Sequence, residues 1–159
     1  MTDFKKQGKR NRANGAAFER RVRKELEEIW NVSKYQNNLD YPKENTNLPP
    51  EERKDLVSIP AKASRFRLSS TGFPDFICYR PLIMKAIDGM KELKQYEVIF
   101  VECKTNGKLD KIEKAKAKWY LENNYCSKFY IAKKTKVKNR IKILYFEVKL
   151  EESDKEVKN

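Results

Sequence analysis

The sequence contains no histidine. A chain without histidine has no Ser-His or Cys-His catalytic pair and no histidine general base. It also has no Cys2His2 zinc finger and no catalytic zinc held by histidine. Any hydrolytic chemistry in this protein would therefore have to use carboxylates, lysines and a hard metal ion.

Cysteine is scarce, with only Cys78, Cys103 and Cys126. These residues lie far apart, so they form neither a metal-ligand spacing nor an even set of disulfides. We expect three reduced, partly buried thiols, which are typical of cytoplasmic proteins. No apolar segment suggests a secretion signal, and no run approaches the ~20 apolar residues of a membrane span. We therefore expect a cytoplasmic location (the host cytoplasm for a viral chain) and no membrane partner.

The length of 159 residues corresponds to about one domain, which is enough to build a core without disulfides. Basic residues outnumber acidic ones by 36 to 23, so the net charge is 36 − 23 = +13. A charge of this size favours a polyanionic partner. The basic residues follow no interfacial-helix pattern, so nucleic acid is favoured over a membrane surface. A basic surface that is merely solvated remains the alternative.

The apolar spacing predicts one α/β (α+β) domain at 15–150, in which a central mixed sheet is flanked by helices. A basic flexible arm is predicted at 1–14 and a charged tail at 151–159. Proline and asparagine predict a loop insertion at 31–60, in which we expect some disorder. Helices are predicted at 16–30 and 109–123, with a short helical segment at 82–93. Strands are predicted at 65–69, 75–79, 97–104, 127–132 and 141–148.

The segment 97–104 is the strongest strand signal in the sequence. Val98, Phe100, Glu102 and Lys104 share one face, and the residues between them are also apolar, which indicates a central strand covered on both sides. Glu102 thus continues an apolar row. A buried carboxylate is costly unless a cation meets it, and Lys104 points the same way.

Asp75 opens the apolar strand that follows Phe73-Pro74. If this strand pairs with 97–104, Asp75 and Glu102 can converge on one cation. Two carboxylates with water and substrate oxygens suit Mg²⁺, and a neighbouring lysine can hold a water and stabilise charge on phosphate. Two alternatives need no metal: Glu102 and Lys104 form an ion pair on one face, and Asp75 caps a turn.

Pro74-Asp75 followed by Glu102-Cys103-Lys104 resembles the PD-(D/E)XK nuclease signature. The segment 14–22 resembles the first helix of archaeal Holliday junction resolvases and related small archaeal and viral nucleases, and the segment 107–119 resembles their second core helix. The resemblance covers about residues 8–135, with 31–60 unmatched. It implies a restriction-endonuclease-like αβββαβ core.

The resemblance also implies a role for each matched residue. Asp75, Glu102 and the backbone carbonyl of Cys103 would bind Mg²⁺, for which Mn²⁺ can substitute. Lys104 would position the attacking water, and Glu19 would reach the metal through a water. The implied activity is that of an endodeoxyribonuclease on duplex or branched DNA, in a family in which homodimers are frequent. As an alternative, Glu19 serves only the helix dipole.

The expected DNA contacts come from basic and hydroxyl residues outside the carboxylate pair. Lys116 stands where the family often has a glutamine, and it could equally extend past Trp119 to solvent. Arg65 and Arg67 could equally form a solvated face. The full expected set is Lys9, Arg10, Arg12, Arg65, Arg67, Ser69, Ser70 and Lys116.

Two other functions compete with the nuclease interpretation. The first is a catalytically silent nucleic-acid-binding protein with the nuclease fold, and the second is a small basic structural protein of a ribosome or nucleoid. Converging carboxylates in a basic cleft would favour the nuclease, because a binding module has no use for them.

Overall fold

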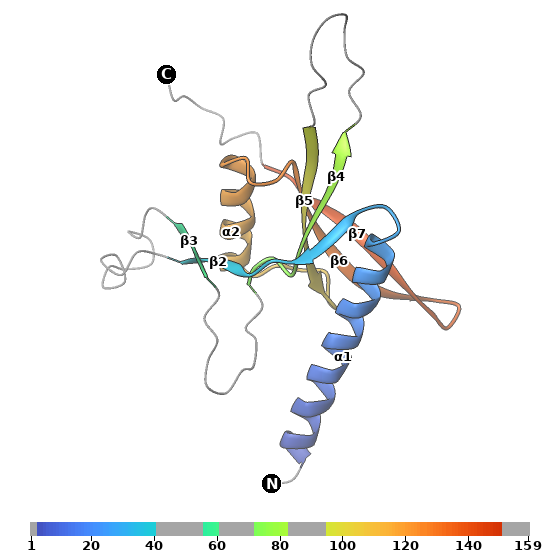
Figure 1. Ribbon diagram of the computed structural model, residues 1–159. Coiled ribbons are helices and arrows are strands. Elements are labelled where there is room, and N and C mark those ends of the chain that lie inside the picture. Colours follow the sequence, from blue (N-terminus) through green and yellow to red (C-terminus); the bar gives the residue numbers. More distant parts are fainter. Residues whose placement is uncertain (1–2, 41–55, 61–71, 83–94, 151–159) are drawn as a thin grey trace, which may run out of the picture.

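The computed structural model describes residues 3–40, 56–60, 72–82 and 95–150. Within these ranges, one domain contains a mixed five-stranded sheet with two helices packed on it (Figure 1), as the sequence predicts. The sheet has the order β1-β4-β5-β6-β7, and β2 pairs with β3 in a separate sheet of two strands. The elements are α1 (Asp3–Leu26), β1 (Asn31–Lys34), β2 (Asn37–Asp40), β3 (Val57–Pro60), β4 (Phe76–Leu82), β5 (Gln95–Lys104), α2 (Lys111–Glu122), β6 (Lys128–Val137) and β7 (Arg140–Val148).

The large sheet contains both parallel and antiparallel neighbouring strands. β1, β4 and β5 are antiparallel neighbours, β5 and β6 are parallel, and β6 and β7 are antiparallel. A parallel pair needs a long crossover, and α2 supplies it between β5 and β6. Without β2 and β3, the chain order is one helix, three strands, a second helix and two strands.

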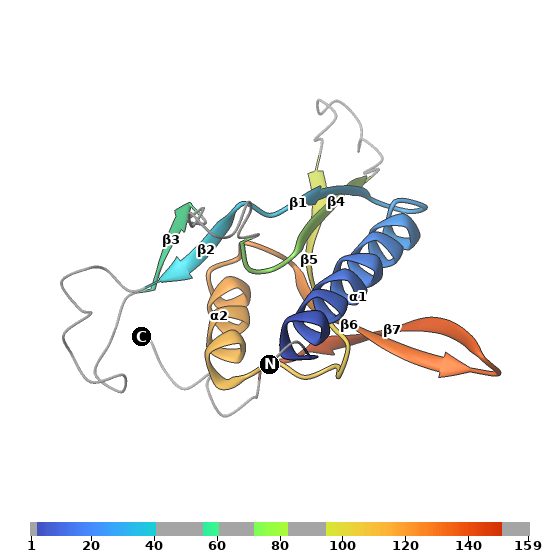
Figure 2. The ribbon, with the colours of Figure 1, turned by 90° about the horizontal axis from the view of Figure 1, so that it is seen from below.

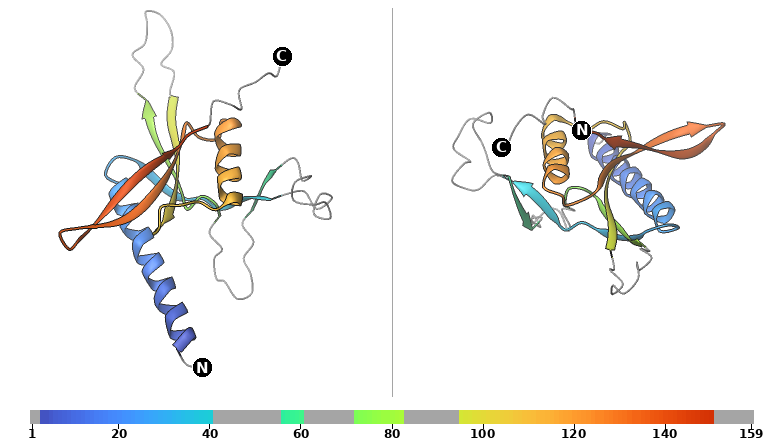
Figure 3. Two further views of the ribbon diagram at one scale, coloured as in Figure 1. Left: turned by 180° about the vertical axis from the view of Figure 1, so that it is seen from behind. Right: turned by 90° about the horizontal axis from the view of Figure 1, so that it is seen from above.

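β5 is the central strand and is apolar on both faces, as predicted. Ile99 and Val101 pack in one cluster with Phe18 and Val22 of α1. Phe100, on the other face, packs in a second cluster that includes residues of α2 and β6, Tyr120 and Phe129 among them. The two helices therefore cover opposite faces of the sheet, and the view from above in Figure 3 shows the central strands passing between them.

Helix α1 begins at Asp3 instead of residue 16 and ends at Leu26 instead of residue 30. The prediction of a separate flexible arm at 1–14 is therefore wrong for residues 3–14. This segment is rich in lysine and arginine, which are good helix formers, and one glycine in a helix costs only about 1 kcal/mol. Asn14-Gly15, a pair that is typical of turns, lies inside the helix. The first buried residue is Phe18, and the half of α1 before it extends away from the sheet (Figures 1 and 3).

The prediction of a loop insertion at 31–60 is wrong where the structure describes it, since β1, β2 and β3 lie there. β1 and β2 are short and mostly polar, and β3 has only the four residues Val57–Pro60, so none of them is a strong sequence signal for a strand. Pairing holds them instead: β1 pairs from Asn31↔Tyr79 to Lys34↔Phe76, and β2 pairs with β3. The segment 41–55, the predicted strand at 65–69, most of the predicted helical segment at 82–93 and the tail at 151–159 lie outside the described residues.

The other predicted elements are confirmed with small shifts. β4 extends through Pro81 to Leu82, three residues beyond the predicted end at residue 79. Pro81 has no backbone N–H. Because β1 pairs with β4 only as far as Tyr79, this missing donor removes no hydrogen bond to β1. Asn106-Gly107 forms the predicted turn, in which Gly107 has a φ of 71° that favours glycine.

The position of Phe100 at the centre of the α2-side cluster predicts its contribution to stability. Phe100→Ala removes a 1% exposed ring, so we expect a loss of about 3–5 kcal/mol in the free energy of unfolding. Ile112→Ala on α2 is the matched control, because Ile112 is 66% exposed, and it should change stability by less than about 0.5 kcal/mol. Urea unfolding followed by circular dichroism measures both. Equal losses would contradict the assigned core.

Candidate active site

Asp75 and Glu102 meet at the end of two paired strands. β4 and β5 pair Phe76 with Val101, so one residue further along Asp75 stands opposite Glu102. Each of the two carboxyl groups accepts a hydrogen bond from a backbone amide of the opposite segment. The amide of Asp75 donates to Glu102 Oε2 at 3.0 Å, and the amide of Cys103 donates to Asp75 Oδ2 at 2.8 Å. The structure thus brings together the two carboxyl groups that the sequence singled out.

The segment before Asp75 is held tightly by the chain that follows β1. The amides of Gly72 and Phe73 donate to the carbonyls of Tyr35 and Asn37 at 3.1 and 3.0 Å, and the amide of Tyr35 donates to the Asp75 carbonyl at 3.2 Å. A Cβ at position 72 would collide with the backbone of Asn37, so only glycine fits there. This anchoring fixes where Asp75 enters the sheet.

Burial makes both carboxyl groups weak acids. Asp75 is 9% exposed and Glu102 is 7% exposed. Desolvation is the largest cause of the raised pKa values, which are about 6 for Asp75 and about 8 for Glu102. The charge of Asp75 raises the pKa of Glu102 further, whereas the Cys103 amide lowers that of Asp75. The pair therefore favours holding a proton near neutral pH unless a cation compensates its charge.

Lys104 is the cation nearest to Glu102. Its Nζ lies 3.2 Å from Glu102 Oε1 and also forms an ion pair with Glu113 of α2. Glu113 is itself fixed by a capping box, in which it accepts from the amide of Asp110 at 3.0 Å. Burial alone would lower the pKa of Lys104, but its hydrogen bonds to Glu113 and Glu102 and their charges leave it raised. Lys104 is thus held in its charged form between Glu113 of α2 and Glu102 of β5.

Glu19 comes from α1 and lies at the same corner of the molecule. Its Oε2 accepts from Lys34 Nζ of β1 at 2.9 Å. The charge of Glu19 raises the pKa of Asp75 and that of Lys34 lowers it, so both lie within electrostatic reach of the pair. The structure shows Glu19 paired with a lysine, and its predicted link to a metal through water stays a prediction.

A polar pocket of about 550 Å³ opens beside these residues. Its lining includes Asn14, Glu19, Cys103, Lys104 and Lys134, so α1, the end of β5 and β6 all contribute. In a strand, the N–H and C=O of one residue point to the same edge. The Cys103 carbonyl therefore lies on the edge at which its amide meets Asp75.

Across the described ranges, no three His, Cys, Asp or Glu side chains lie close enough together to hold a metal ion. The candidate donors are thus the two carboxylates of Asp75 and Glu102 with the Cys103 carbonyl. Mg²⁺ is commonly held by one or two carboxylates and completes its shell with waters and substrate oxygens. The donor set fits that pattern, and it lacks the histidine nitrogen or cysteine sulfur that is typical of zinc sites.

The predicted DNA contacts are spread over different surroundings. Lys9, Arg10 and Arg12 are exposed on the projecting half of α1. Lys116 is half-buried on α2, where burial lowers its pKa and its Nζ donates to Asn38 Oδ1 at 2.8 Å. The ammonium group also lies 6.0 Å from the ring centre of Phe73. Arg65, Arg67, Ser69 and Ser70 lie outside the described residues.

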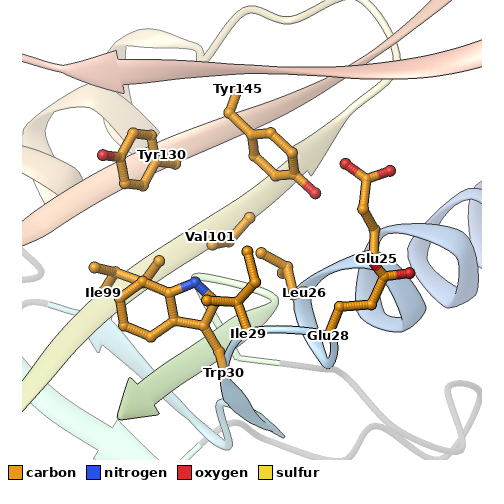
Figure 4. Close-up of a pocket in the computed structure, with 9 residues that line it drawn as sticks. All are labelled: Glu25, Leu26, Glu28, Ile29, Trp30, Ile99, Val101, Tyr130 and Tyr145. Atoms are coloured by element: carbon orange, nitrogen blue, oxygen red, sulfur yellow. The ribbon is translucent and has the colours of Figure 1, made fainter. Parts of the chain in front are cut away.

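A second pocket, of about 510 Å³, is mostly apolar and is lined by neither Asp75 nor Glu102 (Figure 4). Trp30, Ile99, Val101 and Tyr130 form much of its wall, and the hydroxyl of Tyr145 points toward Glu25. Its lining contains no lysine or arginine that could bind a phosphate, and its carboxylates, Glu25 and Glu28, belong to one side of the pocket (Figure 4). The polar pocket is lined by Glu19 and Lys104, and Lys104 contacts Glu102, so we place the candidate chemistry beside that pocket.

Three residues of the site escaped the sequence analysis. Lys34 lies in the segment predicted as loop, and Asn38 lies in the same segment, so neither gave a usable signal. Glu113 did give one, because Asp110-Lys-Ile-Glu113 has the spacing of a capping box. That spacing predicts the helix start but not the ion pair with Lys104.

The cysteines are free, as expected. Cys78 and Cys126 are buried, and burial raises the pKa of each thiol to about 12. A thiol with such a pKa is protonated and unreactive at neutral pH. The cysteines therefore contribute packing, and the candidate chemistry does not use them as nucleophiles.

Comparison with known proteins adds no identification: no family model, curated protein or solved structure matches the chain. In the part of the chain that the structure describes, neither helix is long and apolar enough to cross a membrane. The function is therefore inferred from the geometry and chemistry of the site.

The raised pKa values predict how stability depends on pH without metal. The folded protein holds protons on Asp75 and Glu102 that the unfolded chain releases at lower pH, so stability should fall as pH rises from 5 to 8. In Glu102→Gln, the fall between pH 6 and 8 should largely disappear. Urea midpoints in EDTA at pH 5, 6.5 and 8 measure this dependence. Parallel curves for the two proteins would show that Glu102 is ionised throughout.

Proposed function

We propose that the protein is a Mg²⁺-dependent DNA endonuclease of the PD-(D/E)XK type, with Asp75, Glu102 and Lys104 at its centre. The observation that carries the proposal is the meeting of two buried carboxyl groups and a lysine at the end of paired central strands. The order of the elements around the sheet supports it, since a helix, three strands, a helix and a strand occur in the sequence that this core requires.

The carboxyl pair provides the binding site that hydrolysis of a phosphodiester needs. When bound, a divalent cation would supply Lewis acidity and activate a water at neutral pH. Asp75 and Glu102 lose their protons on binding it, which removes the penalty of a buried carboxyl pair. Metal affinity therefore rises with pH up to about the pKa of Glu102, which is about 8.

Lys104 has a separate task in the proposed reaction. Its ammonium group is held beside Glu102 by Glu113, so it is oriented before any substrate arrives. From this position it can donate to the attacking water and to a phosphate oxygen, and it can stabilise the charge that develops there. Lys104 is not a ligand, because a charged amine has no lone pair.

The polar pocket and the charge of the chain indicate the substrate. The carboxylates lie beside a polar pocket whose wall includes Lys104 and Lys134, in a protein of net charge +13. A polyanion is attracted to such a surface, and the exposed Lys9, Arg10 and Arg12 extend it along α1. We infer that the substrate is DNA, duplex or branched, with Holliday junctions included.

The competing proposal is a catalytically silent nucleic-acid-binding protein with the same fold. It accounts for the basic surface equally well. It gives no reason for two carboxyl groups to be buried against each other, because acids repel a phosphate. The buried pair therefore favours the nuclease, and cleavage assays distinguish the two proposals.

Isosteric substitutions of the carboxyl pair test the mechanism. Asp75→Asn and Glu102→Gln should each lower cleavage of plasmid and junction DNA by roughly 10³-fold or more, because the metal loses an anionic ligand. Each should retain or increase DNA affinity, because a negative charge near the phosphate is gone. Lys104→Ala should also stop cleavage but should leave Mg²⁺ binding intact. Rates with Mg²⁺ and affinities in EDTA measure the two effects.

Glu97→Gln is the matched control for these substitutions. Glu97 lies on the same strand but is paired with Arg80, at 2.7 Å. It should cut DNA like the parent protein. If Glu102→Gln also cuts like the parent, the assignment of the active site is wrong. If the parent binds DNA but never cuts it with Mg²⁺ or Mn²⁺, the silent-binding protein is the better account.

The contact between α2 and Lys104 makes Glu113 a positioning residue. Glu113→Gln should lower the cleavage rate by roughly 10–100-fold, because the ammonium group loses the partner that orients it. It should also move the alkaline limb of the pH–rate profile to lower pH, since Glu113 helps to raise the pKa of Lys104. Glu122→Gln, on the same helix and exposed, is the control. A uniform drop with an unshifted profile would indicate a purely structural role.

A further inference from the structure

The β6–β7 hairpin is longer than the sheet that supports it. Its strands pair without interruption from Phe129↔Val148 to Val137↔Arg140. β5 pairs with β6 only from Lys128 to Lys133, so the part beyond Lys133 has no strand beside β6 within the described residues. This outer part extends as a two-stranded ribbon past the rest of the sheet (Figures 1 and 2).

The tip of this ribbon is a tight turn. Lys138 and Asn139 connect the strands, with φ values of 46° and 63°. Two positive φ values in a two-residue connection are typical of a type I′ turn, which matches the twist of the flanking strands. The ribbon is thus a well-formed element, and its lysines occupy defined positions along it.

The ribbon is strongly and uniformly basic. From position 133 to position 146 the sequence has six basic residues and no acidic residue. In the described part of the chain, none of the six takes part in an ion pair. They are Lys133, Lys134, Lys136, Lys138, Arg140 and Lys142.

The charges lie on both faces of the ribbon. Side chains alternate along a strand, so Lys134 and Lys136 share one face and Lys133 lies on the other. Arg140 stands opposite Val137 and Lys142 stands opposite Thr135, which places both on the Lys133 face. Two copies of this ribbon packed together would bring like charges into contact, which disfavours a second copy as its partner.

The basic track begins at the candidate active site. Lys133 is the neighbour of Lys104 across the parallel β5–β6 ladder. Lys134 lines the polar pocket together with Glu19 and Lys104, and it also lines a smaller pocket against Arg21 of α1. From Lys133 to Lys138 the track runs ~17 Å, at ~3.3 Å per residue. One strand of a duplex presents about five phosphates over that length.

We propose that the β6–β7 ribbon is a nucleic-acid-binding arm, which contacts the phosphate backbone of a duplex whose scissile strand lies at Asp75 and Glu102. This inference rests on the proposed function, because the ribbon extends from that site. The contact is electrostatic and independent of sequence, since lysines spaced along a ribbon read phosphates and not base edges.

The test removes three charges from the ribbon and compares a variant with the same net charge. The first variant carries Lys134→Gln, Lys136→Gln and Lys138→Gln. The control carries Lys111→Gln, Lys114→Gln and Lys128→Gln, which are exposed lysines outside the outer ribbon. Both have a net charge of 13 − 3 = +10. Fluorescence anisotropy with a labelled 30-base-pair duplex in EDTA, at several salt concentrations, gives Kd and its salt dependence.

The ribbon variant should bind at least about tenfold more weakly at 0.1 M salt, and the slope of log K against log salt should become shallower by about 2–3. The control should change little. Equal losses in both variants, or none in the ribbon variant, would overturn the inference. Lys136→Glu alone is a second variant, and it should weaken binding with unchanged thermal unfolding.

The outcome for the parent protein separates the two proposals. If the parent neither binds nor cuts DNA, the proposed function is wrong, and the ribbon inference that rests on it is wrong as well. If the parent binds and cuts while the ribbon variant binds equally well, only the ribbon inference fails. Sedimentation supplies one further outcome: a dimeric parent that becomes monomeric in the ribbon variant would assign the ribbon to a second copy of the chain and would overturn the inference.

Discussion

Asp75 and Glu102 face each other with 9% and 7% of their surfaces exposed, and two carboxyl groups so placed are costly to ionise. The surrounding structure compensates for this cost in several ways. Each carboxyl group accepts an amide from the other strand, and Lys104 places a positive charge beside Glu102. These contacts require β4 to begin where β5 ends, and that register in turn requires the close packing of Gly72 on the chain after β1. The local fold is thus arranged around the pair.

The charges of the described residues fall into two groups. Near the pair, cations and anions alternate: Lys34 binds Glu19, and Lys104 binds both Glu102 and Glu113. Such short contacts balance the buried acids and fix side-chain positions. Among the described residues, a second group of positive charges lies on the exposed half of α1 and along the β6–β7 hairpin. A phosphate approaching the site would be attracted over a long range and would meet an ordered set of charges only at close range.

An element of the fold or of the site could be predicted from the sequence where neighbouring residues carry a pattern that marks it. β5 was predictable because its apolar residues continue on both faces, and α2 because its apolar residues recur at helical spacing. The pairing of Asp75 with Glu102 was inferred from two strands and a family resemblance, and the register bears out their meeting. The start of α1 was missed because nothing apolar marks its exposed half.

The strands at Asn31–Lys34 and Asn37–Asp40 could not be predicted for a different reason. Their residues are mostly polar, and pairing with β4 and β3 holds them as strands. Lys34 and Asn38, which bind Glu19 and Lys116, lie on these strands, so the missing strands concealed two members of the site. Contacts between distant segments are not encoded in any local pattern.

The buried carboxyl pair also distinguishes the two proposals for the basic surface, a nuclease and a silent nucleic-acid-binding protein. Lysines on α1 and the β6–β7 hairpin would serve a binding protein and a nuclease equally. An acid that only filled space could be replaced by an apolar residue of similar size, with a gain in stability, because buried ion pairs are often less stable than hydrophobic packing. Asp75 and Glu102 instead have raised pKa values, and Glu102 is paired with Lys104, which lines a polar pocket. On the proposed function, a divalent cation would offset that cost, since the carboxylates that repel each other would both attract the metal. Stability alone would favour an apolar pair at this position, and the proposed function gives a reason for an acidic one.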